Sequence, residues 1–306
     1  MERVLIRMCA SVGVVAVLAA ALVVQTGQAA RSTRSRSGSS LDRLPDLDQE
    51  TPSQLQVKVF RSTSGFSYHL GFRSAVGNVG PGPLIVDGSR SVTSASQMRV
   101  DQVIEREGAG TRTVADIGRM QYAVSPDHQH WHYLQFERYE VERYELQRAG
   151  DGRVVRTARK IGFCLGDRYR VTTRPVPGAL ASPAYTGRCG LGRPDLMRLR
   201  EGISVGYGDD YSAFLEGQDL PLDGLADGRY VLVNRVNTNR RLRELSFANN
   251  ASSVLLDLQW HSSNPYIRVL RTCPDTSRCR DAVHVHTVAS GLEIPRDIAS
   301  PTAVNS

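Results

Sequence analysis

The sequence predicts an all-β protein, an antiparallel β-sandwich-like domain with long irregular loops. Apolar residues recur mostly with a period of two, which is typical of strands that bury one face. Clusters of Gly, Pro, Asn and Asp separate these short runs, as expected for turns between strands. No long segment shows the apolar stripe with a period of 3.6 residues that an amphipathic helix requires.

The expected elements follow one another from Leu55 onward. Alternating or β-rich apolar runs predict strands at residues 55–59, 98–104, 230–233 and 254–258. Turn clusters lie between them, for example at residues 77–83 and 223–228. Residues 168–202 form a long irregular stretch, and a loop of that size in a compact domain is usually functional or pinned.

The first 29 residues have the pattern of a secretory signal peptide. Arg3 and Arg7 precede an apolar run at residues 12–24, and small residues suited to a signal peptidase follow. A transmembrane anchor is the alternative, but the uninterrupted run is shorter than the roughly 20 residues that a bilayer requires. We therefore expect secretion, to the extracellular space or the cell envelope, without stable membrane insertion.

The rest of the chain is expected to hold one domain between a flexible linker and a tail. Residues 30–50 are rich in Arg, Ser, Asp and Pro and predict a flexible linker. The domain is expected at residues 51–262. Residues 263–306 lose the apolar pattern and predict a tail with a short disulfide loop.

Four cysteines remain after the signal peptide, and export would place them in an oxidising compartment. Cys273 and Cys279 are close in sequence and are expected to pair. Cys164 would then pair with Cys189 and pin the long irregular stretch. Two other pairings are possible, and so is a four-thiolate zinc site, although no C-x-x-C pair occurs.

The charge of the chain comes almost entirely from arginine. The 306 residues include 38 Lys and Arg against 31 Asp and Glu, a formal net charge of +7. Only Lys58 and Lys160 are lysines. Such a bias usually reflects a GC-rich coding sequence, so we do not expect a nucleic-acid partner. It makes the two remaining lysines worth closer attention.

Three histidines give the sharpest local signal. His128, His130 and His132 alternate along one expected strand, so their side chains should project from one face. Neutral imidazoles suit copper and zinc, and Cu²⁺ binds most tightly among the divalent first-row ions. The alternative is a hydrated sheet face that carries histidines without a metal. Three of the seven histidines in one phase favour a metal site.

Other catalytic motifs are weak. Residues 202–206 match the bare G-x-S-x-G pattern of serine hydrolases, but that motif needs a strand-to-helix turn in an α/β sheet, which is not expected here. No phosphate-binding loop of the Walker type occurs, which argues against nucleotide chemistry.

Several blocks, in one consistent order, resemble the lysyl oxidase family. The histidine run, followed by Phe136 and Tyr139, is similar to the copper-binding strand of that family. The further similar blocks are residues 44–47, 160–167 and 202–211, Gln218, and residues 227–230 and 249–250. The resemblance extends roughly from residue 44 to residue 258 and explains the G-x-S-x-G pattern without a hydrolase.

The resemblance implies a copper amine oxidase whose second cofactor is lysine tyrosylquinone. In this family Cu²⁺ and dioxygen oxidise a tyrosine, to which a lysine amine adds. The matching residues are Tyr211 and Lys160, and arginine could not replace this lysine because guanidinium stays protonated. The implied reaction converts a primary amine, with peptidyl lysine as one candidate, to an aldehyde and releases ammonia and hydrogen peroxide. Asp209 and Asp210 are the nearest candidates for the catalytic base, or alternatively a turn-forming pair.

Two other classes remain open at this point. A secreted, non-catalytic copper-binding β-sandwich would bind the metal without forming a quinone. An adhesion-type β-sandwich at the cell envelope would need neither copper nor quinone. Lys160 and Tyr211 favour the oxidase, because neither alternative requires them.

Overall fold

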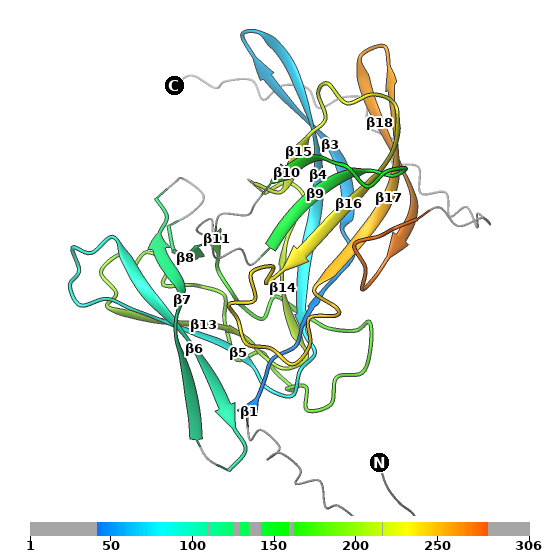
Figure 1. The fold of residues 1–306 in the computed structure, drawn as a ribbon. Helices are drawn as coiled ribbons and strands as arrows, with labels where there is room; N and C mark the ends of the chain where they lie inside the picture. Colours follow the sequence, from blue (N-terminus) through cyan, green and yellow to red (C-terminus); the bar gives the residue numbers. More distant parts are fainter. Residues whose placement is uncertain are drawn as a thin grey trace, which may run out of the picture. The chain divides into compact units, whose positions relative to one another are not determined.

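The structure, a computed structural model, describes residues 42–108, 110–124, 129–134, 142–158, 162–215 and 217–280. These residues form strands, turns and loops but no helix, which confirms the all-β class. In the same part of the chain, no helix offers the length and apolar character needed to cross a membrane. The strands form three sheets in which every pairing is antiparallel (Figure 1).

The first sheet carries the histidine strand. Its order within the described residues is β11–β8–β7–β6–β5–β13, with β1 paired to β6. The bounds are β1 (Asp42–Arg43), β5 (Leu84–Ser89), β6 (Gln97–Arg106), β7 (Gly110–Tyr122), β8 (Trp131–Leu134), β11 (Gly162–Phe163) and β13 (Arg198–Ile203). Met98, Met120, Trp131 and Tyr133 are at most 1% exposed and pack in one core cluster. The strand β8 is therefore fixed on its apolar side.

The other two sheets face each other across a second core. One has the order β12–β14–β4–β15, with β2 and β3 also paired to β4, and the other has the order β10–β9–β16–β17–β18. The bounds are β2 (Leu47–Gln49), β3 (Ser53–Ser62), β4 (Gly65–Asn78), β9 (Glu142–Arg148), β10 (Val154–Ala158), β12 (Tyr169–Arg170), β14 (Tyr207–Tyr211), β15 (Asp219–Pro221), β16 (Gly228–Val236), β17 (Ala251–His261) and β18 (Asn264–Cys273). Phe72 of β4 and Leu256 of β17 belong to the same buried cluster, so these sheets pack as a sandwich.

The strands expected from the sequence occur where the patterns place them. Residues 55–59 lie in β3, residues 98–104 in β6, residues 230–233 in β16 and residues 254–258 in β17. The turn expected at residues 77–83 follows the end of β4.

The structure differs from the expected linker and tail at their boundaries with the domain. Within the expected linker, β1 and β2 are strands, and Leu47 and Gln49 are each only 1% exposed. Within the expected tail, β18 pairs with β17. The alternation of apolar residues in β18 is short, since it consists of Pro265, Ile267 and Val269. The sequence pattern alone is therefore too weak to predict this strand.

The long loop after β12 is pinned at several points. The disulfides Cys164–Cys189 and Cys273–Cys279 are both present, which confirms the expected pairing. The Asp167 carboxylate accepts hydrogen bonds from the backbone N–H groups of Ala184, Tyr185 and Ser204. Hydrogen bonds from several N–H donors to one carboxylate are strong, so they hold this irregular loop in a defined conformation.

Candidate metal and cofactor site

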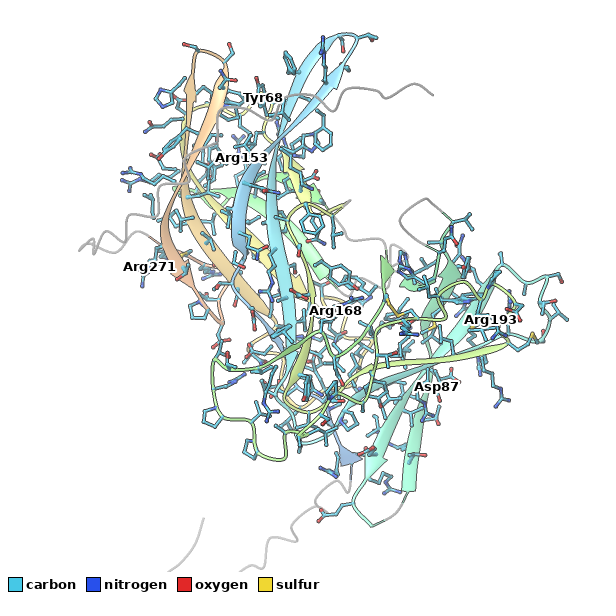
Figure 2. The ribbon with its side chains drawn as sticks, turned by 180° about the vertical axis from the view of Figure 1, so that it is seen from behind. Tyr68, Asp87, Arg153, Arg168, Arg193 and Arg271 are labelled. Carbon is cyan, nitrogen blue, oxygen red and sulfur yellow. A yellow bond between two sulfur atoms is a disulfide. The ribbon has the colours of Figure 1, made fainter. Side chains whose placement is uncertain are left out.

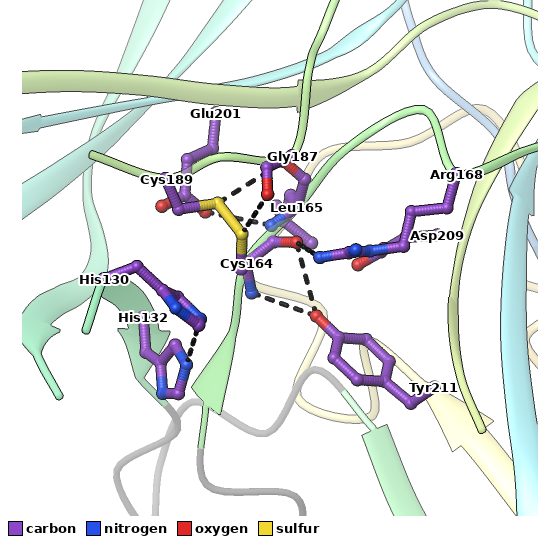
Figure 3. Close-up of a disulfide and its surroundings, with 10 residues drawn as sticks. All are labelled: His130, His132, Cys164, Leu165, Arg168, Gly187, Cys189, Glu201, Asp209 and Tyr211. Atoms are coloured by element: carbon purple, nitrogen blue, oxygen red, sulfur yellow. Dashed lines mark hydrogen bonds and ion pairs between the residues drawn. A yellow bond between two sulfur atoms is a disulfide. The ribbon is translucent and has the colours of Figure 1, made fainter. Parts of the chain in front are cut away.

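The two described histidines of the run face each other. His132 lies in β8 and His130 just before it, and their Nε2 atoms are 2.8 Å apart (Figure 3). Trp131 and Tyr133 point to the opposite side, where they are 0% and 1% exposed. The alternation expected from the sequence therefore holds for the described part of the run. His128, the first histidine of the run, lies outside the described residues.

The spacing of the two nitrogens fits a shared metal ion. Two nitrogen ligands at about 2.0 Å from a metal and at right angles to each other lie about 2.8 Å apart. The same separation also suits a hydrogen bond between one protonated and one unprotonated ring nitrogen. Among the residues that the structure describes, no group of three His, Cys, Asp or Glu side chains gathers as a metal site. The described pair thus supplies two convergent nitrogens.

Gly162 allows the histidine strand and its neighbour to approach closely. It pairs with Leu134 in the β11–β8 ladder. A Cβ atom at this position would lie 2.7 Å from Cβ and 2.8 Å from Nδ1 of His132, closer than real contacts allow. The ring of His132 therefore rests against the backbone of Gly162, two residues after Lys160. Lys160 itself lies outside the described residues.

Tyr211 reaches the same short segment from another sheet. It ends β14, which pairs with β4. Its hydroxyl accepts a hydrogen bond from the backbone N–H of Cys164 at 3.0 Å, and its ring meets that of Phe163 edge to face, with centroids 5.4 Å apart. Three consecutive residues, Gly162, Phe163 and Cys164, thus contact His132 and Tyr211. The segment that follows Lys160 brings the histidine strand and the tyrosine together (Figure 3).

The two candidate acids lie on opposite faces of β14. Side chains alternate along a strand, so Asp209 shares a face with Tyr211 and Asp210 does not. Asp209 is 3% exposed and accepts a hydrogen bond from Nε of Arg168 at 2.5 Å. Asp210 instead pairs with Nε of Arg73 at 2.7 Å. Asp209 is therefore the acid of the pair that belongs to the tyrosine side.

Burial dominates the electrostatics of the tyrosine. Loss of hydration raises the pKa of Tyr211 well above its usual range, and the carboxylate of Asp209 raises it further. The guanidinium of Arg168 and the N–H of Cys164 act in the opposite direction on this pKa. Burial and Asp209 therefore favour the neutral phenol, and the positive groups around the ring favour its ionisation.

A buried acid, Glu201, lies in the wall of the site and was not singled out from the sequence. It is 2% exposed, and one carboxylate oxygen accepts the N–H of Leu165 at 3.1 Å. Burial raises its pKa well above the usual range, with a further contribution from Asp209. One signal was available: Leu199, Glu201 and Ile203 share one phase of β13, so the acid occupies an apolar position.

Two other sequence features have structural roles. Ser204, the serine of the G-x-S-x-G pattern, is 0% exposed and its hydroxyl donates to Asp167 at 2.7 Å, so it helps to hold the long loop. Lys58 donates to the carbonyl of Leu215 at 2.9 Å and to Asp219 at 3.0 Å, and thereby fastens the loop after Tyr211.

The comparison with known protein families gives a match over the centre of the chain. The model of the family described as lysyl oxidase matches residues 89–268, more than half of the chain. The matched region contains both histidines of the described pair, the Cys164–Cys189 disulfide and Tyr211. A parallel comparison with individual curated proteins found no significant match.

Proposed function

This chain belongs to the lysyl oxidase family, and from that premise we propose that it is a secreted copper- and quinone-dependent amine oxidase. It would convert primary amines, with peptidyl lysine as one candidate, to aldehydes, with dioxygen as oxidant and release of ammonia and hydrogen peroxide. Membership in the family supports an oxidoreductase that acts on amines. The copper, the quinone and the substrate are our proposal.

One observation carries the proposal. The hydroxyl of Tyr211 bonds to Cys164, four residues after Lys160, while the ring of His132 rests on Gly162 in the same segment. A copper-dependent cross-link between a lysine and a tyrosine requires all three elements at one place. Neither a non-catalytic copper-binding β-sandwich nor an adhesion-type β-sandwich requires a tyrosine hydroxyl beside the segment that follows Lys160.

Each residue has a proposed task. His130 and His132, together with His128, would hold Cu²⁺. Lys160 and Tyr211 would supply the amine and the ring of lysine tyrosylquinone, a cofactor that accepts the electron pair and the amino group of the substrate. Asp209 would take the proton from the substrate carbon next to the amine, since it is the acid on the tyrosine face of β14. Phe163, 3% exposed, would exclude water from one side of the ring.

The export of the protein is supported by its covalent structure. Two disulfides occur in the described part of the chain, and disulfides persist in oxidising compartments. A secreted or envelope location also gives access to dioxygen and to extracellular amines.

The test is phenylhydrazine labelling after copper loading in air, followed by peptide mass mapping. We expect a coloured adduct on a peptide that joins Lys160 to Tyr211, absent in Lys160→Arg and in Tyr211→Phe. Copper bound by the wild-type protein with two separate, unlabelled peptides would instead favour the non-catalytic copper-binding sandwich.

A further inference from the structure

We propose that Arg168 is a positioning residue for cofactor formation: it fastens the segment that follows Lys160 to the strand that carries Tyr211, and it places a positive charge beside the tyrosine ring. The inference rests on the proposed function. It concerns the assembly of the site before any amine is oxidised.

The first support is a pair of bonds that joins the two segments. Nη2 of Arg168 donates to the carbonyl of Cys164 at 3.2 Å, and Nε donates to Asp209 at 2.5 Å. Cys164 belongs to the segment that follows Lys160, and Asp209 lies two residues before Tyr211. A single planar guanidinium thus spans both, a task for which arginine is suited because its donors form a rigid fork.

The second support is the backbone of the same residue. The N–H of Arg168 donates to the carbonyl of Gly208 at 2.9 Å, so main chain and side chain bind the same strand. Figure 2 labels Arg168 near the centre of the view and Arg193 toward its edge. Their side chains are 37% and 59% exposed. Arg168 is therefore held in place, which a positioning role requires.

The third support is the location of the charge. The Cζ atom of Arg168 lies 5.8 Å from the centroid of the Tyr211 ring, within the range in which a cation and an aromatic ring attract each other. A tyrosine gives up an electron to an oxidant more readily as the phenolate than as the neutral phenol. The guanidinium of Arg168 favours loss of the proton because it lowers the pKa of Tyr211, whereas Asp209 raises it.

The chemistry that Arg168 would serve balances with dioxygen as the only oxidant. The Tyr211 phenol, the Lys160 amine and two molecules of dioxygen give the cross-linked quinone, one water and one hydrogen peroxide. One oxygen atom stays on the ring, a bond forms between a ring carbon and the lysine nitrogen, and four hydrogens leave with the water and the peroxide. Bond formation requires the nitrogen and the ring to meet, and a misplacement of about 1 Å can slow such a step about 100-fold.

The test compares Arg168→Gln and Arg168→Lys with Arg73→Gln. Arg73 is a matched control, because it forms a partly buried ion pair with Asp210 on the opposite face of the same strand. Three quantities are measured after copper loading in air: bound copper, melting temperature, and the rate at which the cross-linked Lys160–Tyr211 peptide appears in the mass map.

We expect Arg168→Gln to bind copper as the wild-type protein does but to form the cross-link about 10- to 100-fold more slowly. Arg168→Lys should be intermediate, since an ammonium keeps the charge but cannot span both partners. Arg73→Gln should lose a similar amount of thermal stability and still form the cross-link at the wild-type rate.

Cross-linking at the wild-type rate in Arg168→Gln would overturn the inference and leave the proposed function intact. Equal slowing in Arg73→Gln would also overturn it, because general destabilisation would then explain the effect. If Arg168→Gln does not fold, Arg168→Lys decides between the same outcomes. No cross-link in the wild-type protein would remove the proposed function and this inference together.

Discussion

The hydroxyl of Tyr211 accepts a hydrogen bond from the backbone N–H of Cys164 at 3.0 Å, although the two residues are 47 positions apart in sequence. The strands β11 and β14, which flank this bond, belong to different sheets. Packing between the sheets therefore places the tyrosine hydroxyl against the segment that follows Lys160.

The close approach of β11 to β8 predicts a strong effect of one methyl group. In Gly162→Ala the new Cβ would overlap Cβ and the ring of His132, so His132 or the backbone of residue 162 must shift and the spacing to His130 is disturbed. We expect copper affinity to fall about 10- to 100-fold, the range for lost support of a metal ligand. A titration of the secreted protein with Cu²⁺ measures this.

Gly150→Ala is the matched control, because a Cβ atom at Gly150 would meet nothing within 4 Å. It should bind copper as the wild-type protein does. Unchanged affinity in Gly162→Ala would mean that His132 in this position is not a ligand.

The two disulfides should differ in their importance for the site. Cys164–Cys189 closes a loop with a sequence separation of 25, and Cys273–Cys279 one of 6. Chain entropy gives the first about 3.5 kcal/mol and the second about 2 kcal/mol of stability. Urea unfolding of the two double Cys→Ala variants measures these losses.

Only the first disulfide should also affect cross-linking. The backbone of Cys164 binds the tyrosine hydroxyl, and the carbonyl of Cys189 accepts the N–H of Trp131 in the histidine strand. Removing the Cys164–Cys189 disulfide should slow the appearance of the cross-linked Lys160–Tyr211 peptide. The Cys273/Cys279 variant should form this peptide at the wild-type rate. Equal rates in both variants would show that the disulfide contributes stability alone.

Many of the strands can be predicted from the local alternation of apolar residues. The remaining features depend on close contacts between segments that are distant in the sequence. Residues 98–104 alternate for most of their length and lie in β6. The sequence did not single out β4, which pairs with β2, β3, β14 and β15, because glycines interrupt its apolar pattern. At Gly71 an added Cβ would lie 3.0 Å from Cε of Lys58 and 3.1 Å from the carbonyl oxygen of Ala213. Both neighbours come from other segments of the chain, so the local sequence does not reveal this close approach.

The candidate site shows the same division. The alternation of His130 and His132 against Trp131 was predictable, since a strand fixes which residues share a face. The bond of Tyr211 to Cys164 and the bridge made by Arg168 were not, because both depend on how separate sheets pack. The resemblance identified the residues, and the tertiary structure supplies their contacts.

Asp209 and Asp210 can be distinguished by a pair of amide variants. Asp209→Asn keeps an oxygen that accepts the bond from Arg168, so the cross-link should still form. If Asp209 is the base, amine turnover should fall about 10²- to 10⁴-fold, the usual contribution of general base catalysis. Asp210→Asn should retain near wild-type turnover, because Asp210 faces Arg73. Peroxide release from a simple primary amine measures both, and similar rates in the two variants would exclude Asp209 as the base.

Glu244 should make the stability of the fold depend on pH. It accepts hydrogen bonds from Leu47, Asn237 and Asn250, and burial nevertheless raises the pKa of its carboxyl to about 7 from an ordinary value of 4.5. Between these values the folded state holds a proton that the unfolded state releases. The free energy of unfolding should therefore decrease as the pH rises from about 4.5 through 7, by roughly 3 kcal/mol from this group.

The variant Glu244→Gln cannot titrate at this position and isolates that contribution. Its amide nitrogen would meet the N–H of Leu47, so it should be less stable than the wild type at low pH, where the wild-type carboxyl is protonated and neutral. The difference between the two proteins should then shrink as the pH rises, because only the wild type bears the cost of a buried charge. Urea unfolding at several pH values between 4.5 and 8 measures the two curves, with Asp87→Asn, at an exposed pair with Arg200, expected to follow the wild-type slope. Parallel curves for Glu244→Gln and the wild type would show that Glu244 is already ionised throughout this range and that its three hydrogen bonds outweigh its burial.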